Sequence, residues 1–494
     1  MLHSRIVLPV AALAACSLWA DQAIKLTRHR QLFVDDHLIS SSSGLNRVIH
    51  SASKYGDNPI LLPVKPWEGQ YTLLYGTVIR DEEEGIWKMW YSTMNHFRYI
   101  QKIFPESTYL CYATSRDGVH WTRPDLGVIA YRGKTQNNIV LEGTHAPEQG
   151  IEGILDAVSV LKDVNDPDAS RRYKLMVWRH NQKFDGNKST YVLEGEHRMG
   201  DYAAFSPDGI RWSRPERLIF PYLPVRDTMS LMWDPRASKY IAFVKQQVNG
   251  KRARFVSESD DFLTWSTPKQ MLVADERDPA NVELYHNTGF PYEGMYLGLV
   301  TVFHPEPLDN IYLDLQLISS RDGRSWSRVG NRDPFLPVGR RDVDWDFGFH
   351  SPSSGPPVRV GDELWFYYSG RAYRHPVDGQ GREPNKGAIG LAKLRLDGFV
   401  SMDAGDREGT LTTVPLRFND PGLFINADAK NGQIRVEVLD EAGAAIEGLA
   451  SGETLTKDAI RWRASDLSKL RGRAVRLKFY LRNASLYSFG FDAI

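Results

Sequence analysis

SRDGVHWTRP, at residues 115–124, recurs as SPDGIRWSRP from Ser206, as SRDGRSWSRV from Ser320 and, more divergently, as SESDDFLTWSTP from Ser257. In each full copy the Gly supplies the positive φ of a tight turn, and the Asp can bond its own downstream backbone. A tryptophan closes each copy and is large enough to fill the space between neighbouring sheets. The phrase therefore indicates scaffold rather than active site. We expect its tryptophans to be buried near outer strands, away from any ligand: Trp121, Trp212, Trp265 and Trp326.

A second phrase lies upstream of each copy and has the pattern of a β-hairpin. YGTVIRDEEEGIWKMWYS from Tyr75 and TMSLMWDPRASKYIAFVK from Thr228 each join an apolar strand, an acidic turn and an alternating strand that ends in aromatic residues. Five such units without helical periodicity predict an all-β fold, a five-bladed β-propeller over residues 30–404. The shorter strands that follow predict a C-terminal β-sandwich over residues 405–494.

The first residues have the pattern of an export signal. A basic residue, Arg5, precedes an apolar run from Ile6 to Ala15 that is too short to span a membrane. We expect residues 1–20 to be removed and the protein to be exported, as a periplasmic, cell-surface or secreted protein. Two processing sites remain open: a lipobox that ends at Cys16, which would add a lipid anchor, or cleavage after Ala20.

Composition limits the partners and cofactors of the chain. The 61 Lys and Arg residues balance the 61 Asp and Glu residues, so no net field favours nucleic acid or a membrane surface. A carbohydrate partner fits this neutral chain and its 11% of aromatic residues, although β-rich architecture also favours aromatics. Beyond Cys16 only Cys111 remains, which excludes an internal disulfide and a site with several thiolates. We expect no cofactor and no catalytic metal; no ligand loop indicates a structural calcium ion.

Carboxylates recur where the innermost strands enter the predicted channel. Alignment of the units on the turn after the inner strand matches Asp156 with Asp227, and the same count in the fourth unit gives His286, with Glu283 nearby. In the fifth unit the inner strand begins near His350. Glycoside hydrolysis needs one protonated and one ionised carboxyl group, whose pKa values neighbouring charges and burial separate. We therefore interpret Asp156, Asp227 and Glu283 as catalytic, with His286 and His350 as binders of hydroxyl groups.

Other side chains complete the candidate site. Asp346 and Trp345 precede His350 on a loop that can reach the channel mouth, and Trp67 precedes the first inner strand. We expect these three to bind substrate, the tryptophans by stacking on a sugar. The Asp35–Asp36 pair lies in LFVDDHLI, an amphipathic strand that we expect to complete the last blade, so its acids favour a structural role.

Several of these motifs resemble a known group. FVDDHLI, DNPIL, SRDGVHW and LRLDGFVSMDAG are similar to bacterial exported proteins grouped with the N-terminal domain of glycoside hydrolase family 32, in the wider five-bladed set with families 43 and 130. The resemblance implies a propeller glycosidase, with Asp227 as the middle acid, Glu283 as proton donor, and Asp156 or the Asp35–Asp36 pair as base. The motifs of family 32 itself are not intact, because no Pro follows Asp227, so hydrolysis of fructosides is not expected.

Three functions remain open at this point. The first is a glycoside hydrolase that acts at the channel mouth. The alternative is a non-catalytic exported propeller that binds glycan or protein through the same acids. The third is cleavage by β-elimination, which needs a uronic acid and a Tyr or His base, and which the net neutrality of the chain disfavours. The sequence contains no G-x-S-x-G elbow, phosphate loop or H-E-x-x-H motif.

Overall fold

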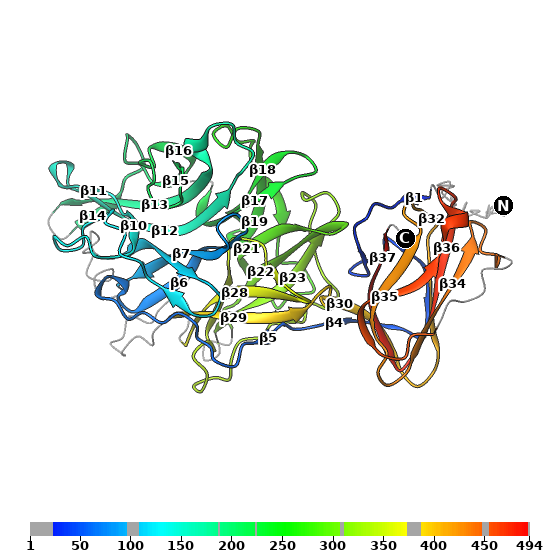
Figure 1. The fold of residues 1–494 in the computed structure, drawn as a ribbon. Helices are drawn as coiled ribbons and strands as arrows, with labels where there is room; N and C mark the ends of the chain where they lie inside the picture. Colours follow the sequence, from blue (N-terminus) through cyan, green and yellow to red (C-terminus); the bar gives the residue numbers. More distant parts are fainter. Residues whose placement is uncertain are drawn as a thin grey trace, which may run out of the picture.

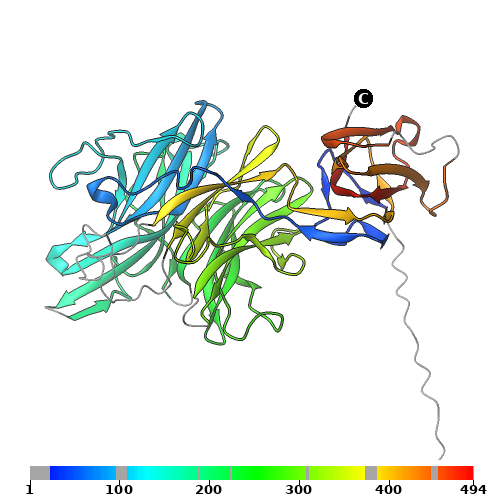
Figure 2. The same ribbon diagram turned by 90° about the horizontal axis from the view of Figure 1, so that it is seen from below.

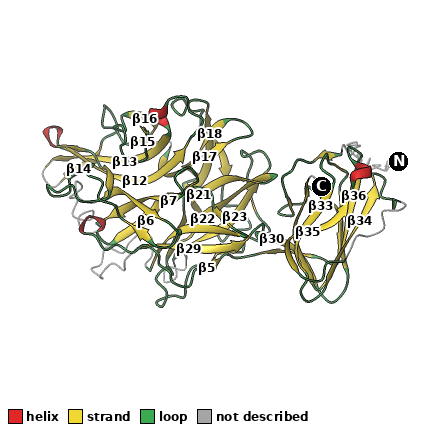
Figure 3. Ribbon diagram, viewed as in Figure 1, coloured by secondary structure: helices red, strands yellow, loops and turns green. Residues whose placement is uncertain are grey.

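The computed structural model describes residues 23–95, 108–185, 188–222, 225–306, 311–372, 387–446 and 454–492. The chain forms two β-rich domains joined by extended segments (Figures 1 and 2), and the all-β prediction is confirmed. Within these ranges helix is confined to short turns at Pro66–Glu68, Pro147–Gln149, Ala169–Arg171 and Ser468–Leu470 (Figure 3). In these ranges no helix has the length and apolarity to cross a membrane. The expected export segment lies outside the described residues.

The larger domain consists of antiparallel units with four main strands each, to which the short strands β9 (Trp121–Thr122), β11 (His145–Ala146), β14 (Lys188–Tyr191), β24 (Ser327–Arg328) and β27 (Val358–Val360) are added. Three are separate sheets, and two more share a sheet that is joined by one parallel pair, Leu313 with Phe349. This grouping supports the expected five blades, and the count itself stays a prediction. The first unit contains β6 (Tyr71–Asp81), β7 (Ile86–Met94), β8 (Thr108–Ser115) and β10 (Ile139–Glu142), and the second contains β12 (Ile151–Lys162), β13 (Tyr173–Asp185), β15 (Gly200–Ser206) and β16 (Arg217–Pro221). The third unit contains β17 (Arg226–Asp234), β18 (Lys239–Val248), β19 (Lys251–Ser259) and β20 (Lys269–Leu272), and the fourth contains β21 (Glu283–Tyr292), β22 (Met295–His304), β23 (Tyr312–Ser320) and β25 (Pro334–Leu336). The fifth unit contains β26 (Phe349–Pro352), β28 (Glu363–Arg371), β29 (Ala388–Arg395) and β5 (Ser53–Lys54).

The first strands of the units form a ring. Strands β6, β12, β17, β21 and β26 contact one another in that order, and β26 contacts β6 again. Hydroxyl groups link successive strands: Thr77 Oγ1 accepts from the Val160 amide at 3.0 Å, and Ser159 Oγ accepts from the Leu231 amide at 3.0 Å. Ser230 continues the series by donating to the Asn287 carbonyl at 2.6 Å. These bonds satisfy backbone groups that no sheet pairs, and they fix the inner strands around one axis.

The recurrent Ser-x-Asp-Gly turns are structural. In the first copy Ser115 Oγ accepts from the Gly118 amide at 2.9 Å, and Asp117 Oδ1 accepts from the His120 amide at 2.8 Å. Each turn also packs on a neighbouring unit, as where Tyr367 in β28 donates to the Gly118 carbonyl at 2.8 Å. Among the closing tryptophans Trp326 is buried, whereas Trp121, Trp212 and Trp265 are only partly buried at the edges of apolar clusters.

An aspartate at the end of an inner strand joins each of three units to the next. Asp234 accepts from the hydroxyl group of Tyr296 in the following unit at 2.7 Å and also pairs with Arg324. Burial alone raises the pKa of Asp234, but these two partners hold it below its ordinary value. The same arrangement joins Asp81 with Tyr173 and Lys88, and Asp163 with Tyr240 and Lys174.

We expect Tyr296→Phe to lower the free energy of unfolding by about 1.5–3 kcal/mol, because a buried hydrogen bond to a charged group is lost. The effect is largest near neutral pH. Asp234 has a lowered pKa in the folded state, so its contribution exists above the unfolded pKa and disappears as the pH falls. Guanidinium denaturation at pH 7 and at about pH 2.5 measures both effects, because the contribution is lost only below the unfolded pKa of 3.8. Tyr191→Phe, at an exposed tyrosine, is the control; equal losses in the two variants would contradict the prediction.

The β-sandwich is built from both ends of the chain, which corrects the expected domain boundaries. Strands from residues 24–49 pair with strands of the C-terminal region, and Phe33 lies in the sandwich core. Segment LFVDDHLI therefore does not complete the last blade; β5 does, by pairing with β29. The first sheet of the sandwich contains β1 (Ile24–Lys25), β3 (Ile39–Ser43), β31 (Gly409–Thr413), β32 (Leu416–Arg417), β34 (Gln433–Asp440) and β36 (Val475–Arg482). The second sheet contains β2 (Gln31–Leu32), β4 (Asn46–Ile49), β30 (Val400–Ala404), β33 (Gly422–Asp428), β35 (Asp458–Asp466) and β37 (Ala484–Asp492).

The two domains are joined by buried polar contacts. Asp397 is fully buried and accepts from Arg30, Tyr292 and Ser488 at 2.6–2.7 Å. Asp35 receives two hydrogen bonds from Arg321, at 2.6 and 2.9 Å. This is the structural role that the sequence favoured for Asp35, and it occupies both oxygens of that carboxylate.

Candidate functional site

Backbone irregularities at equivalent points of the inner strands direct side chains toward the axis. In β12 the pairing shifts after Asp156, and in β17 it shifts between Arg226 and Met229. The residues after Asp156 and Asp227 have positive φ, 43° at Ala157 and 36° at Thr228. Bulges re-aim side chains and recur next to active sites.

In the fourth unit the bulged residue is Tyr285, not His286. The hydroxyl contacts between inner strands give the same register. Ser159 accepts from the Leu231 amide, which adjoins the Ser230 carbonyl, and Ser230 donates to the Asn287 carbonyl. Ser230 and Asn287 therefore hold equivalent positions. Tyr285 therefore matches Ala157 and Thr228, the residues that follow the two aspartates. The sequence alignment was displaced by two residues in this unit, and its equivalent of the two aspartates is Leu284.

Asp156 and Asp227 influence each other's ionisation. Burial and the charge of Asp227 raise the pKa of Asp156 from its ordinary value to about 6. Asp227, whose side chain is about a third exposed, forms an ion pair with Lys245 of β18. Burial lowers the pKa of Lys245, whereas Asp227 opposes this change. One carboxyl group is thus biased toward protonation, and a cation stabilises the other as an anion.

Tyr75 and Tyr285 share a hydrogen bond beside these acids. Phe349 of β26 lies edge-on to both rings, with centroids at 6.4 and 6.1 Å. The Arg371 guanidinium lies 3.8 Å from the Phe349 centroid, and it acts electrostatically on Asp156 and on both tyrosines. Residues of the first, fourth and fifth units therefore meet the two aspartates of the second and third.

Arg254 hydrogen-bonds the backbone of two strands at the candidate site. It is fully buried in β19, and it donates to the Tyr285 carbonyl at 3.1 Å and to the Thr228 carbonyl at 3.3 Å. It also donates to Thr228 Oγ1 at 3.2 Å and to Asn287 Oδ1 at 2.6 Å. Burial lowers its pKa to about 9. One guanidinium thus holds the bulges of two adjacent inner strands.

Asp201 of β15 is a further acid that the sequence did not single out. It is fully buried, and neither carboxyl oxygen has a hydrogen-bond partner among the residues that the structure describes. Burial and the charge of Asp227 raise its pKa well above the ordinary value, which favours the protonated form of Asp201. The signal for Asp201 and Lys245 was a charged residue among apolar neighbours in a strand, which is rare without a use. Arg254 lies in the polar strand KRARFVSES, which gives no such signal.

His286 is buried and faces the ring of Tyr75, with centroids 6.0 Å apart. Burial, assisted by the charges of Arg254 and Lys245, lowers its pKa well below the ordinary value. Its ring is therefore neutral. Neither ring nitrogen has a hydrogen-bond partner within the described part of the chain.

Glu283 is bound by Arg252. Its Oε2 accepts from the Arg252 amide at 2.9 Å and from the Arg252 guanidinium at 3.0 Å. Arg252 also lies 5.5 Å from the centroid of Tyr285, so Glu283 remains at the edge of the same region. The catalytic role of Glu283 stays a prediction. Its partner in the structure is the guanidinium of Arg252.

His350 and Asp346 form a buried network between the fourth and fifth units. The Nε2 atom of His350 lies 3.1 Å from Asp346 Oδ2, and Nδ1 lies 3.3 Å from the Leu336 carbonyl. Lys54 and Tyr368 also bond Asp346, at 2.8 and 2.9 Å. These contacts satisfy both side chains, and they differ from the expected place of His350 on the channel wall.

The two predicted stacking tryptophans have different surroundings. Trp345 stacks on Tyr368, with centroids 5.8 Å apart, and lines a surface depression of about 510 Å³ together with Leu62 and Val343. Trp67 donates to Asn138 Oδ1 at 2.8 Å and packs edge-on against Tyr131. Trp345 thus lines a surface depression, where its stacking on a sugar stays a prediction, and Trp67 is engaged in packing within the first unit.

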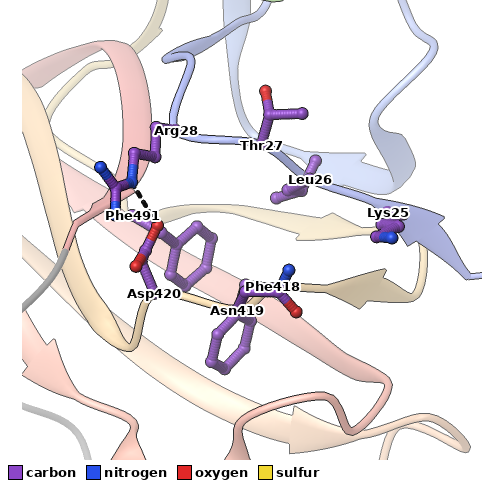
Figure 4. A pocket seen from close by; sticks show the side chains of 8 residues that line it. All are labelled: Lys25, Leu26, Thr27, Arg28, Phe418, Asn419, Asp420 and Phe491. Carbon is purple, nitrogen blue, oxygen red and sulfur yellow. Dashed lines mark hydrogen bonds and ion pairs between the residues drawn. The ribbon is translucent and has the colours of Figure 1, made fainter.

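A second pocket lies on the sandwich, with a volume of about 390 Å³ (Figure 4). Arg28 pairs with Asp420 at 2.8 Å across it. Phe418 and Phe491 stack on each other beneath it and are buried, so neither offers a free aromatic face. Among the described residues no group of three or more His, Cys, Asp or Glu side chains is arranged to hold a metal ion, in this pocket or at the channel.

Comparisons with known proteins give similarity in structure alone. Neither a protein-family model nor a curated protein sequence matches the chain. A similar solved structure is an N-acetylgalactosamine deacetylase from F. plautii in complex with blood group B trisaccharide, with 16% identity and a TM-score of 0.44 over 72% of this chain and 97% of that one. A glycosyl hydrolase from Bacteroides ovatus has 12% identity and a TM-score of 0.46 over 70% and 94%. The β-1,2-mannobiose phosphorylase from Listeria innocua has 12% identity and a TM-score of 0.44 over 70% and 96%.

Proposed function

We propose that the protein is a glycoside hydrolase that acts at the channel mouth. The observation that carries this proposal is the opposed ionisation of two adjacent carboxyl groups, Asp156 with its pKa raised to about 6 and Asp227 paired with Lys245. Glycoside hydrolysis requires a carboxylic acid that protonates the leaving oxygen and a carboxylate that attacks the anomeric carbon or activates water. The site provides both forms at mildly acidic pH.

In this proposal Asp156 is the general acid, in place of Glu283. Asp156 lies among Tyr75, Tyr285 and Asp227, whereas Glu283 is bound by Arg252 through two hydrogen bonds. Asp227 is the base or nucleophile, and Lys245 keeps it ionised. His286, which is neutral, would donate to or accept from a sugar hydroxyl group.

A non-catalytic glycan-binding protein is the second candidate. The ion pairs Asp227–Lys245 and Glu283–Arg252 favour it, because each acid already has a cationic partner and can serve to grip hydroxyl groups. A binder retains its ligand unchanged, and an enzyme converts it.

The test is an oligosaccharide panel incubated with the protein, followed by mass analysis of products. Reactions run in buffer alone and with inorganic phosphate, because the similar structures include both hydrolases and a phosphorylase. Release of sugar without phosphate supports hydrolysis. Products that appear only with phosphate, or ligands that bind and are never converted, would contradict it.

We also propose that the chain is exported, because Arg5 and the following apolar run have the order of a signal peptide. Mass spectrometry of the mature N-terminus is the measurement. A lipid on Cys16 indicates a cell-surface anchor, and a chain that begins at Asp21 indicates cleavage after Ala20. An uncleaved Met1 in the native host would contradict export.

A further inference from the structure

The surface depression of about 510 Å³ that Trp345 lines lies at one end of the fifth unit. One of its lining residues, Phe347, comes just before the inner strand β26. Strand β26 runs in the same direction as β21. Phe349 faces Tyr285 near the start of both strands, and further along the Ser354 carbonyl accepts from Thr288. The depression therefore lies at the end of the domain where the inner strands begin.

The candidate acids lie at the same end of the domain. Asp156 and Asp227 are both in the first half of their inner strands, β12 and β17. Ala372 lines the depression, and the residue before it, Arg371, acts electrostatically on Asp156. Because consecutive Cα atoms are about 3.8 Å apart, the wall of the depression adjoins the residues that surround the acids. A ligand that extends beyond the acids can therefore reach the depression.

Trp345 has a fixed orientation on the wall of the depression. Its indole stacks on Tyr368, with centroids 5.8 Å apart and ring planes inclined by 28°. It also covers Gly370, where a Cβ atom would clash with the indole. The next residue, Asp346, is bonded by Lys54 at 2.8 Å and by Tyr368 at 2.9 Å. An aromatic ring that is already held in place loses little conformational entropy when a ligand stacks on it.

The lining combines exposed apolar side chains with carboxylates. Val343 is 66% exposed and Leu62 is 44% exposed, and apolar side chains that gather at one exposed place mark binding surfaces. The ionisable lining residues are Asp342 and Asp344, without a lysine or arginine in the described lining. The Arg340 guanidinium binds both oxygens of Asp344 at 3.1 Å, whereas Asp342 is exposed. This surface fits a ring with an apolar face and a rim of hydroxyl groups, and like charge disfavours an anion there.

We propose that the depression is a second sugar-binding subsite, which holds a neutral pyranose ring of an oligosaccharide by stacking on Trp345. Val343 and Leu62 contact the edges of this ring, and Asp342 accepts from its hydroxyl groups. The position of the cleaved bond, at the two acids, rests on the proposed function; the binding chemistry of the depression does not. A ligand that occupies both places is a chain of several sugars, so affinity should rise with chain length.

The first experiment measures binding by calorimetry to the full-length protein. The probes are manno-, cello-, galacto- and xylo-oligosaccharides, each from the disaccharide to the hexasaccharide. We expect Kd in at least one series to fall about ten- to a hundred-fold once the chain is long enough to reach Trp345, because a further ring is then buried on an aromatic face. No binding by any neutral series, no gain with chain length, or tighter binding of oligogalacturonides than of every neutral series would overturn the proposal.

Trp345→Ala should remove most of the gain with chain length and leave binding of the disaccharide within about threefold, because only the distant contact is lost. Trp345→Tyr keeps an aromatic ring and should recover part of the gain. Val343→Ser should weaken the long chain about three- to tenfold by removing an apolar contact. Val164→Ser is the matched control, at a valine that is 54% exposed in the turn between β12 and β13. If Trp345→Ala does not fold, the serine pair decides, and equal affinities in that pair would overturn the proposal.

Oxidative footprinting of the wild type locates the bound chain directly. Trp345 and Trp233 are both partly buried, and Trp233 lies near the opposite end of its inner strand, β17. Saturation with the oligosaccharide that binds most tightly should lower the oxidation of Trp345 severalfold and leave that of Trp233 unchanged. Equal oxidation of Trp345 with and without the oligosaccharide would show that the chain binds elsewhere and would overturn the proposal.

The proposed function fails separately from this subsite. An oligosaccharide that protects Trp345 and is never cleaved leaves the subsite intact and removes the hydrolase. Cleavage of long chains at the same rate and with the same KM by the wild type and by Trp345→Ala leaves the hydrolase intact and removes the subsite.

Discussion

Asp156→Asn is expected to lower kcat on an unactivated glycoside by about 10²–10⁴-fold, the usual contribution of a positioned general acid. The amide keeps the shape of the carboxyl group and cannot donate a proton to the leaving oxygen. Substrate binding should change little, because the transferred proton matters in the transition state. Aryl glycosides with good leaving groups should lose far less, since they depart without protonation. Steady-state kinetics on both substrate types measures the difference.

The pH profile tests the same assignment. Asp156 must be protonated to act as acid, so kcat/KM of the wild type should fall about tenfold per pH unit above about pH 6. Glu283→Gln, which alters a carboxylate already bound by Arg252, should keep this limb and lose less than about tenfold in kcat. A profile that falls below pH 6 would make Asp156 the base. A larger loss in Glu283→Gln than in Asp156→Asn would return the acid role to Glu283.

Stability provides the control for misfolding. The folded-state pKa of Asp156 lies above the unfolded value, so the folded protein binds this proton more tightly. The ionised group therefore lowers stability as the pH rises from about 4 through about 6, and the loss persists above that range. Asp156→Asn lacks this loss, and its Tm at pH 8 should equal or exceed that of the wild type. An inactive variant with a lower Tm would not support the catalytic assignment.

The repeated turn and hairpin phrases were sufficient to predict the all-β class, because their Gly, Asp and Trp residues act locally and through adjacent strands. The domain boundary was not predictable in this way. Gln31 and Leu32 pair with β37, more than four hundred positions away in the chain, and the next residue, Phe33, packs in the sandwich core. No local signal distinguishes such a strand from one that completes a blade, and only long-range packing decides between them.

The acids of the site followed from a count of residues back from the turn after each inner strand. The count placed Asp156 and Asp227 in one electrostatic cluster. It missed the register of the fourth unit by two residues, because the inner strand of that unit is longer between the bulge and the turn. Lys245 and Arg254 were not identified, since Lys245 pairs with Asp227 across a hairpin and Arg254 reaches the backbone of the next unit. Such pairings depend on how the units pack, which the sequence does not state directly.

Arg254→Met is expected to lower the free energy of unfolding by about 3–5 kcal/mol, because it leaves buried acceptors on two strands without their donor. The Thr228 and Tyr285 carbonyls lie at the bulges, where Thr228 holds a φ of 36° that is costly for a residue with a branched side chain. Without the guanidinium, the hydrogen bond from Thr228 Oγ1 to the Tyr285 carbonyl, at 2.9 Å, still links these bulges. Asp227 precedes Thr228, so it should lose its fixed orientation as well.

Two measurements separate positioning from simple loss of stability. Arg359→Met, in an exposed hairpin, controls for removal of an arginine and should change the guanidinium midpoint little. Arg254→Lys keeps the buried charge and provides fewer donors, so it should fold and recover stability only in part. If Arg254 positions Asp227, Arg254→Lys should lower kcat at least tenfold at a temperature where the variant is folded, with KM nearly unchanged. Full activity in folded Arg254→Lys would show that the charge suffices and that the forked contact with the two bulges does not set the geometry of the site.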